Sequence, residues 1–294
     1  GPIRGEHALT DIPELRRRLR ALVDSGRTVA VPGATDALSA KLIEKHGFEA
    51  AYIGSYATAA SRYGLPDTGL LTLDDLVQQA RTIVNAVSIP VIADAEDGCN
   101  DPANLWRTVQ AFEQAGVAAV HIEDHAGPGK HTSLPQKLRP PEEAAARIKA
   151  AVEARKDPNF LIAARTDALW IGGELGDAVR RLEAYARAGA DLVFPTHATP
   201  AQLAEIKRRT HKPLMIVDLP QGTLADEEKA GAALVLYYGL ATLIQFDALQ
   251  TALETFRRTR DANAVTGYRE RIAGLEEFLG YPDYIERAKR LGRP

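Results

Sequence analysis

The sequence contains one cysteine, Cys99, in 294 residues, which excludes a disulfide within the chain. Because disulfides persist in oxidising compartments, this composition favours a cytoplasmic location. The sequence also lacks an apolar run of about 18 residues, the length that a transmembrane helix needs. Charges of both signs are interspersed and nearly cancel, at 36 Lys and Arg against 39 Asp and Glu. We therefore expect binding neither to nucleic acid nor to a membrane surface.

Short apolar runs rich in β-branched residues recur along the chain, and 45% of all residues are hydrophobic. Continuous apolar runs of this kind are typical of strands that are buried on both faces of a parallel sheet. They predict eight strands, at residues 28–31, 50–53, 90–93, 118–122, 160–163, 192–194, 214–217 and 233–236.

Amphipathic segments separate these runs and predict helices at residues 37–45, 73–87, 104–115, 141–155, 175–188, 200–209 and 224–230. Several end at a glycine just before the next strand, as at Gly116, where a left-handed cap is expected. Eight such strand–helix units predict an α/β fold, a (β/α)8 TIM barrel. A doubly wound sheet is the alternative, but no Gly-x-Gly-x-x-Gly motif follows the first predicted strand.

The chain continues for more than fifty residues after the eighth predicted strand. We expect one barrel domain over residues 1–294, in which residues 240–294 form a C-terminal helical extension. The extension contains helical stretches at 248–260 and 268–278, followed by a turn at Gly280-Tyr281-Pro282 and a charged tail. It is expected to pack either on a neighbouring subunit or on the surface of the same chain.

Polar residues follow most of the predicted strands, at the end where a parallel barrel gathers its catalytic groups. Burying so many charges together costs free energy unless they are paired or bind a metal, so the pattern predicts a functional site there. In chain order they include Thr35, Asp36, Ser55, Tyr56, Asp94, Glu96, Asp97, Glu123, Asp124, His125, Arg165, Asp167, His197 and Asp218.

The carboxylates after the third and fourth predicted strands suggest a metal site. Asp94, Glu96 and Glu123 are the expected ligands, whereas Asp97 and Asp124 either join them or cap nearby loops and helices. Oxygen donors without a His/Cys set favour Mg²⁺, with Mn²⁺ also possible, over Zn²⁺.

Three further features of this end point to anion binding. Arg165 leaves a buried strand, so it either pairs with Glu123 or holds a substrate carboxylate through two hydrogen bonds. His197 is a second anion contact, an acid/base, or a surface histidine without such a role. The backbone N–H groups of the Ser55-Tyr56-Ala57 turn are placed to receive an oxyanion.

Residues 125–139, HAGPGKHTSLPQKLR, form a long loop directly after the acidic strand end. Loops longer than about 12 residues in a compact domain are usually functional, and we expect a gate over the site. Lys130, His131, Thr132 and Ser133 would reach the site when the gate closes. A mobile solvated loop is the alternative.

Six stretches occur in order: VPGATDALSAKLIEKHGFEAAYIGS, YGLPDTGLLTLDD, IPVIADAEDG, AGVAAVHIED, DPNFLIAARTDA and YARAGADLVFP. With them the chain resembles the isocitrate lyase / phosphoenolpyruvate mutase superfamily over essentially the whole barrel. The resemblance implies a homo-dimer or homo-tetramer whose subunits exchange their last helices. It also implies a small 2-oxo carboxylate substrate and Mg²⁺ held by Asp94, Glu96 and Glu123, with Asp67 close by.

The resemblance further implies roles for single residues. His197 matches a histidine that contacts the phosphonate in the mutase branch. The residues implied in substrate binding are Ser55, Tyr56, Ala57, Asp67, Ser133, Arg165 and His197, and those implied in catalysis are Lys130, Thr132, Arg165 and His197.

The gate departs from one branch of the superfamily. Methylisocitrate, isocitrate and dimethylmalate lyases carry a catalytic cysteine in a Lys-(Lys/Arg)-Cys-Gly-His gate, and the stretch Gly129–Leu134 here has none. KHTSL looks more like the phosphonopyruvate hydrolase and mutase gate, while PLMIVDLPQ is similar to the oxaloacetate decarboxylase branch. We expect a bond β to the carbonyl to break and leave an enolate, as in oxaloacetate decarboxylation. Carbon–phosphorus cleavage is the second hypothesis, and a barrel that only binds or assembles is the third.

Overall fold

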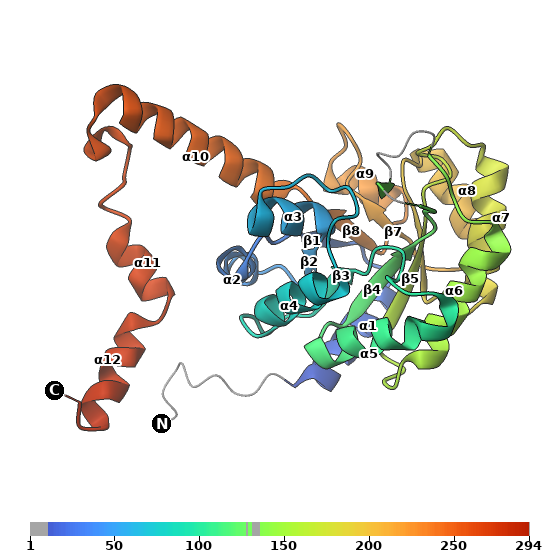
Figure 1. The fold of residues 1–294 in the computed structure, drawn as a ribbon, viewed down its shortest axis with the longest axis horizontal. Helices are drawn as coiled ribbons and strands as arrows, with labels where there is room; N and C mark the ends of the chain where they lie inside the picture. Colours follow the sequence, from blue (N-terminus) through green and yellow to red (C-terminus); the bar gives the residue numbers. More distant parts are fainter. Residues whose placement is uncertain (1–10, 128, 131–135, 294) are drawn as a thin grey trace. The chain divides into compact units, whose positions relative to one another are not determined.

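Eight parallel strands alternate with helices along the chain (Figure 1). The computed structural model describes residues 11–127, 129–130 and 136–293. Each strand overlaps its predicted run, since a short, continuous apolar segment is well suited to burial on both faces of a parallel sheet. The strands are β1 (Val29–Pro32), β2 (Ala51–Ile53), β3 (Val91–Asp94), β4 (Ala119–Glu123), β5 (Leu161–Thr166), β6 (Leu192–Pro195), β7 (Met215–Val217) and β8 (Leu234–Tyr237).

The strands close into the predicted barrel. Two hydrogen-bonded ladders run in the orders β2-β3-β4-β5-β6 and β1-β8-β7. Single bridges between Gly33 and Tyr52 and between Val193 and Leu214 join the two ladders at both edges. Closure brings the carboxyl ends of all eight strands to one rim, which we call the carboxyl rim. A doubly wound open sheet is excluded by this strand order.

The helices of the barrel pack one apolar face against the strands. In α4, Leu76, Ala80 and Ile83 are buried, and Thr72 caps the first turn by accepting a hydrogen bond from the Asp75 backbone. The helices are α1 (Ile12–Asp24), α2 (Ala37–Lys45), α3 (Ser55–Tyr63), α4 (Leu73–Val84), α5 (Leu105–Ala115), α6 (Pro141–Ala154), α7 (Leu175–Arg187), α8 (Pro200–Thr210) and α9 (Leu224–Lys229), with a 3₁₀ turn, Pro102–Asn104, before α5.

Two helices of the barrel unit were not predicted from the sequence. α1 buries Leu19 and Val23 in the same apolar cluster as the barrel interior, where Leu19 is fully enclosed. Burial of one such side chain stabilises the fold by roughly 1.5–3 kcal/mol. α3 begins at Ser55, so the expected strand-to-loop turn at residues 54–57 is instead the first turn of a helix with Gly54 at its N-cap.

Residues 243–293 belong to a second compact unit, distinct from the barrel unit, Asp11–Thr242. Its described helices are α10 (Leu240–Thr259), which begins in the barrel unit, the 3₁₀ turn Ala262–Ala264, α11 (Ile272–Phe278) and α12 (Tyr281–Arg290). The expected turn is confined to Leu279-Gly280, and the charged residues that follow form a helix where a tail was expected. Gly280 adopts a φ of 86° at the N-cap and Pro282 occupies the first turn, a position that tolerates proline.

Exchange of these helices between subunits stays a prediction, as does a single domain over the whole chain. In the described ranges, none of the helices combines the length and apolar character that a bilayer crossing demands.

Candidate active site at the carboxyl end of the barrel

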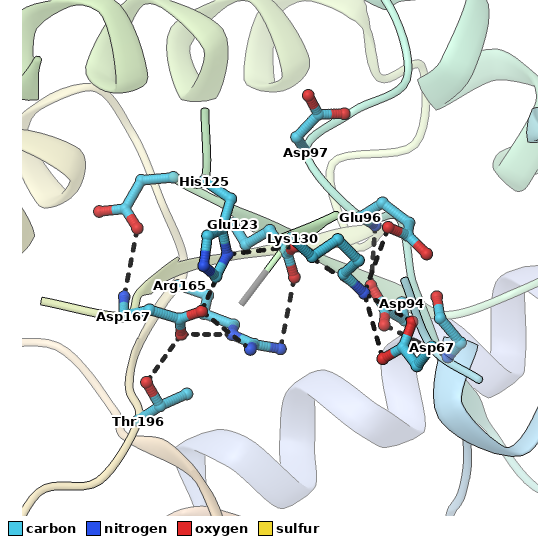
Figure 2. A network of polar contacts seen from close by, with 12 residues as sticks. Asp67, Asp94, Glu96, Asp97, Glu123, His125, Lys130, Arg165, Asp167 and Thr196 are labelled. Carbon is cyan, nitrogen blue, oxygen red and sulfur yellow. Dashed lines mark hydrogen bonds and ion pairs between the residues drawn. The ribbon is translucent and has the colours of Figure 1, made fainter. Parts of the chain in front are cut away.

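Asp94, Glu96 and Glu123, which we call the acidic cluster, lie together at the carboxyl rim (Figure 2). Asp94 ends β3 and Glu123 ends the neighbouring strand β4. The backbone N–H of Glu123 donates to the carbonyl oxygen of Glu96 at 2.8 Å, which ties the loop after β3 to the end of β4. All three side chains are more than nine-tenths buried. The structure thus brings together the three residues expected to bind a metal.

Lys130 reaches this cluster from the gate segment, residues 125–139. Its Nζ lies 3.1 Å from Oδ1 of Asp67, 3.2 Å from Oε2 of Glu96 and 3.9 Å from Oε1 of Glu123 (Figure 2). Burial alone would lower the pKa of Lys130, but the carboxylates of Glu123 and Asp94 hold it well above its usual value. The expected entry of Lys130 into the site and the nearby position of Asp67 are both seen.

The carboxylates of the acidic cluster differ in their proton affinity. Burial raises the pKa of Glu96 to about 8, with repulsion from Asp94 and Glu123 adding to it against the attraction of Lys130. Burial acts in the same direction on Asp94 and Glu123, yet the nearby cations lower both pKa values. Three carboxylates so close together cannot all be charged without positive charge beside them.

The donor set of the acidic cluster fits a hard divalent cation. Among the described residues, no hydrogen bond reaches the buried Oε1 of Glu96 or either carboxylate oxygen of Glu123, whose neighbours are the more distant charges of Lys130 and Arg165. Within the described ranges, no three His, Cys, Asp or Glu side chains form a ready set of direct ligands. Mg²⁺ keeps several waters and takes one or two direct carboxylates, so such a set is not required. Asp94, Glu96 and Glu123 stay the predicted Mg²⁺ residues.

The amino end of α3 faces the acidic cluster. The backbone N–H of Ser55 donates to Oδ2 of Asp94 at 3.3 Å. The first N–H groups of a helix have no partner within the helix, so Ser55, Tyr56 and Ala57 present donors with the positive end of the helix dipole. The predicted anion-binding role therefore rests on a helix N-terminus. The Tyr56 side chain points elsewhere, edge-on to Tyr238.

Arg165 is held by two carboxylates. Its Nε and Nη2 donate to the two oxygens of Asp167 at 2.8 and 3.1 Å, and its Nη1 lies 3.4 Å from Oε2 of Glu123. The pairing with Glu123 considered from the sequence is present, but the stronger partner is Asp167. Asp167 also accepts from Thr196 Oγ1 at 2.7 Å and lies 3.0 Å from Nδ1 of His125. From the sequence, Asp167 was counted among the polar residues of the rim, but no role was expected for it there.

Asp97 and Asp124 serve the loops around the site. Asp124 accepts hydrogen bonds from Tyr185 Oη at 2.7 Å and from the Asp167 backbone at 3.2 Å. Asp97 forms an ion pair of 2.9 Å with Arg139, at the end of the gate segment. Of the alternatives open for these two residues, the structure supports the anchoring role.

His197 follows β6 in a left-handed backbone conformation, with a φ of 56°. Its ring stacks on Trp170, with ring centroids 4.6 Å apart. Among the described residues, no hydrogen bond or ion pair joins His197 to the acidic cluster. Thr132 and Ser133, which were expected to act from the gate, lie outside the described residues, as does His131.

Two further polar residues lie beneath the acidic cluster, inside the barrel. Tyr52 Oη and His121 Nε2 are 2.7 Å apart, and His121 Nδ1 lies 3.8 Å from Oδ1 of Asp94. Both are buried. Sequence reasoning missed them because they are part of β2 and β4, although a histidine within the apolar run AAVHI is a signal that could have found this pair.

A cavity opens beside the acidic cluster. Its volume is about 510 Å³, which is ample for a small 2-oxo acid. Its lining combines the charged groups with two leucines and polar side chains, including Glu96, Glu123, Lys130, Leu71, Leu73, Asn100 and Arg107.

The fold and this rim define a (β/α)8-barrel with a buried site of paired charges. The Phosphoenolpyruvate phosphomutase family matches residues 19–257. The 2-methylisocitrate lyase of Shewanella oneidensis is 33% identical over 282 residues, 93% of this chain and 96% of that one. The chain therefore belongs to the isocitrate lyase / phosphoenolpyruvate mutase superfamily of enzymes, lyases and mutases that act on small 2-oxo acids.

Other similarities cover different branches of this superfamily. The 2,3-dimethylmalate lyase of Eubacterium barkeri is 43% identical over 178 residues, 60% of this chain, and the match spans only 61% of that lyase. Phosphoenolpyruvate phosphomutase from Streptomyces platensis subsp. rosaceus superposes with a TM-score of 0.85 at 32% identity, covering 94% of this chain and 98% of that one.

Two solved structures contain small carboxylate ligands. Phosphonopyruvate hydrolase in complex with oxalate and Mg²⁺ has a TM-score of 0.85 at 30% identity, covering 94% of this chain and 98% of that one. Oxaloacetate acetylhydrolase in complex with the inhibitor 3,3-difluorooxalacetate has a TM-score of 0.84 at 27% identity, covering 96% of this chain and 98% of that one. Similarity to several branches leaves the substrate open.

Proposed function

We propose that this protein is a Mg²⁺-dependent lyase that cleaves the bond β to the carbonyl of a small 2-oxo acid. Oxaloacetate is the first candidate substrate and decarboxylation the first candidate reaction. The observation that carries the proposal is the convergence at one buried rim of the acidic cluster with two cations, Lys130 and Arg165. Such a site suits a small, doubly charged anion next to a divalent cation.

Asp94, Glu96 and Glu123 would hold Mg²⁺, which when bound supplies a Lewis acid that polarises a carbonyl oxygen. Arg165 is pre-oriented by Asp167, so its remaining donors contact the substrate carboxylate without a further ordering cost. The N–H groups at the start of α3 stabilise negative charge that develops on the carbonyl oxygen as the bond breaks.

The cysteine chemistry of the related lyases has no counterpart at the gate. The one cysteine of the chain, Cys99, lies after β3 instead. Although Cys99 is exposed as a residue, partial desolvation of its thiol and the nearby carboxylate of Asp97 raise the pKa of the thiol, so it is a poor source of thiolate. Departure of CO₂ requires no proton from the protein, and this supports decarboxylation ahead of cleavages that need a gate acid.

Carbon–phosphorus cleavage is the second candidate. It is supported by His197 at the carboxyl rim, by the KHTSL stretch and by similarity to phosphonopyruvate hydrolase. A phosphonate would leave as a metaphosphate-like group and pass to water. A barrel that only binds or assembles is the third candidate, and the retained charged rim argues against it.

The test is to incubate the purified protein and Mg²⁺ with oxaloacetate or with phosphonopyruvate, and to measure pyruvate, CO₂, oxalate and phosphate. Mg²⁺ alone decarboxylates oxaloacetate slowly, so rates are compared with those of the Asp94→Ala variant. We expect pyruvate and CO₂ from oxaloacetate. Formation of oxalate rather than CO₂ from oxaloacetate would show that the reaction is not decarboxylation. Release of phosphate from phosphonopyruvate, with no turnover of oxaloacetate, would show the same. Inactivity with both substrates, together with no Mg²⁺ binding, would favour the non-catalytic alternative.

A further inference from the structure

Trp170 contacts the two expected anion-binding residues Arg165, on β5, and His197, which follows β6. Its ring stacks on the imidazole of His197, with centroids 4.6 Å apart and planes inclined by 14°. The Cζ of Arg165 lies 5.7 Å from the centre of the Trp170 ring, within the range of a cation–π contact. The Cζ of Arg165 also lies 5.5 Å from the centre of the Phe194 ring.

The turn that carries Trp170 is fixed by its own backbone. The N–H groups of Ile171 and Gly173 donate to the carbonyl oxygens of Asp167 and Ala168 at 3.0 and 2.8 Å. A Cβ on Gly173 would lie 2.6 Å from the Ala168 oxygen, so only glycine permits this closure. The indole is therefore presented at the tip of a tight turn directly after β5.

A side-chain hydrogen bond joins this turn to the strand end that carries His197. Thr196 Oγ1 donates to Oδ1 of Asp167 at 2.7 Å, and Asp167 in turn orients Arg165 (Figure 2). His197 follows Thr196 with a φ of 56°, an uncommon conformation for a residue other than glycine. The stacked indole and the hydrogen bond between Thr196 and Asp167 lie on either side of this position in the chain of contacts.

We propose that Trp170 is a positioning residue that holds the His197 imidazole and the Arg165 guanidinium as paired contacts for an oxyanion group of the substrate. The proposal deepens the proposed function and rests on it only for the identity of the substrate. The oxyanion is a carboxylate or a phosphonate. Without the indole, His197 would be free to rotate away from Arg165, and the pair would lose its fixed separation.

The charges around His197 agree with this role. Burial lowers the pKa of His197, and Arg165 lowers it further, against an opposing effect of Asp167. The neutral imidazole donates one hydrogen bond at pH 7 without repelling Arg165. Asp167 and Arg165 are the charged groups that face His197, and their mutual attraction lowers the pKa of Asp167 and raises that of Arg165, so both stay charged while His197 titrates.

The chain offers a direct optical test, because it contains only two tryptophans. Trp106 is exposed on α5, so the Trp106→Phe variant leaves Trp170 as the only indole emitter. A stacked imidazolium quenches indole emission. We expect the emission to fall as the pH drops below about 6.5, and the step to vanish when His197→Gln is added. An absent step, or one that survives His197→Gln, would overturn the proposal whatever substrate the protein has.

Ligand binding provides a second test that does not depend on turnover. Oxalate and phosphonoacetate are titrated in the presence of Mg²⁺ into the wild type, Trp170→Ala and Trp170→Phe, each checked for folding by circular dichroism. We expect Trp170→Ala to bind at least one of the two anions about tenfold more weakly than the wild type. Trp170→Phe keeps an aromatic ring, so its affinities should stay within about threefold of the wild-type values. If only the affinity for oxalate falls, the oxyanion that His197 and Arg165 contact is a carboxylate. If only the affinity for phosphonoacetate falls, it is a phosphonate. Unchanged affinity for both anions in Trp170→Ala would refute the role.

Discussion

The Nζ of Lys130 lies 3.2 Å from Oε2 of Glu96, and both side chains are more than nine-tenths buried. The same ammonium is 3.9 Å from Oε1 of Glu123. A residue of the gate segment therefore places a positive charge among the carboxylates that we propose for Mg²⁺. We therefore expect the gate segment and the proposed metal site to be electrostatically coupled, because a cation bound there and the ammonium would repel each other.

Lys130→Gln should bind Mg²⁺ more tightly and turn over substrate more slowly. Loss of a repelling charge at this distance is expected to raise the Mg²⁺ affinity about tenfold, which corresponds to about 1.4 kcal/mol. Calorimetric titration of Mg²⁺ measures the first effect, and steady-state kinetics the second. Lys137→Gln is the matched control, since Lys137 is exposed in the same segment. Equal Mg²⁺ affinity in Lys130→Gln and wild type would contradict the coupling.

Asp94→Asn should abolish Mg²⁺ binding and reduce turnover by at least about a hundredfold. Asp94 ends β3 at the centre of the acidic cluster, and the amide keeps its shape while removing the charge. The control is Asp101→Asn, at an exposed helix cap that asparagine also fills well. Titration calorimetry and the product assay are the measurements. Survival of both properties in Asp94→Asn would remove Asp94 from the metal site.

Asp167→Asn should destabilise the protein strongly. The substitution leaves the buried guanidinium of Arg165 without its two-point partner and weakens the contact with Thr196. Breaking a buried pair on one side typically costs about 3–5 kcal/mol. Urea unfolding would show this loss, whereas Asp177→Asn, on the half-exposed side of α7, should cost about 1 kcal/mol or less. Similar midpoints for the two variants would show that the pair contributes little.

His125 should make stability fall at alkaline pH. Burial lowers its pKa, but Asp167 and Glu123 overcome this and raise the pKa to about 9. The pKa of His125 in the unfolded chain is about 6.5. Its contribution to the free energy of unfolding is therefore complete below a pH of about 6.5 and is lost as the pH rises through 9. We expect a loss on the order of 3 kcal/mol in metal-free protein.

Urea unfolding between pH 6 and 10 in the presence of a chelator measures this dependence. His125→Gln should flatten the curve, whereas His46→Gln, at an exposed position that follows α2, should leave it as in the wild type. A wild-type curve without this decline would show that His125 is not charged in the folded state.

The C-terminal unit should associate with a second copy of the chain. Apolar side chains on α10 are exposed within the single chain, at 68% for Phe246 and 57% for Leu253. Surfaces of this kind mark association sites. Phe246→Asp should shift sedimentation velocity profiles from a dimer or tetramer toward the monomer, and Gln250→Asp, at an exposed polar position of the same helix, should not. A monomeric wild type would refute the predicted oligomer.

Most of the barrel could be predicted because its signal is local. Each strand is a short apolar run, and each ends where polar residues begin, so strand positions and the polar rim follow from neighbours in sequence. The helices that were not predicted begin at residues whose local signal is absent or points to a turn. α3 begins with small and polar residues that lack an apolar period, and α12 begins at Gly280-Tyr281-Pro282, which is also a turn signal.

The candidate site was only partly predictable from the sequence. Asp94, Glu96 and Glu123 follow neighbouring strands, so their proximity was expected from strand order. The partner of Arg165 was not, because Asp167 is two residues away and the geometry of the strand end decides whether the two side chains meet. Trp170 gave no functional signal at all, since a lone tryptophan after a strand is usually a packing residue.

The sequence by itself determined a barrel with acidic strand ends and a gate without cysteine, because apolar periodicity and residue chemistry are properties of the chain. Only the tertiary structure decided which charges share a site. Lys130 is 63 residues from Asp67 in sequence, yet their charged groups are 3.1 Å apart. Charge interactions depend on such distances, and the closure of the sheet sets them.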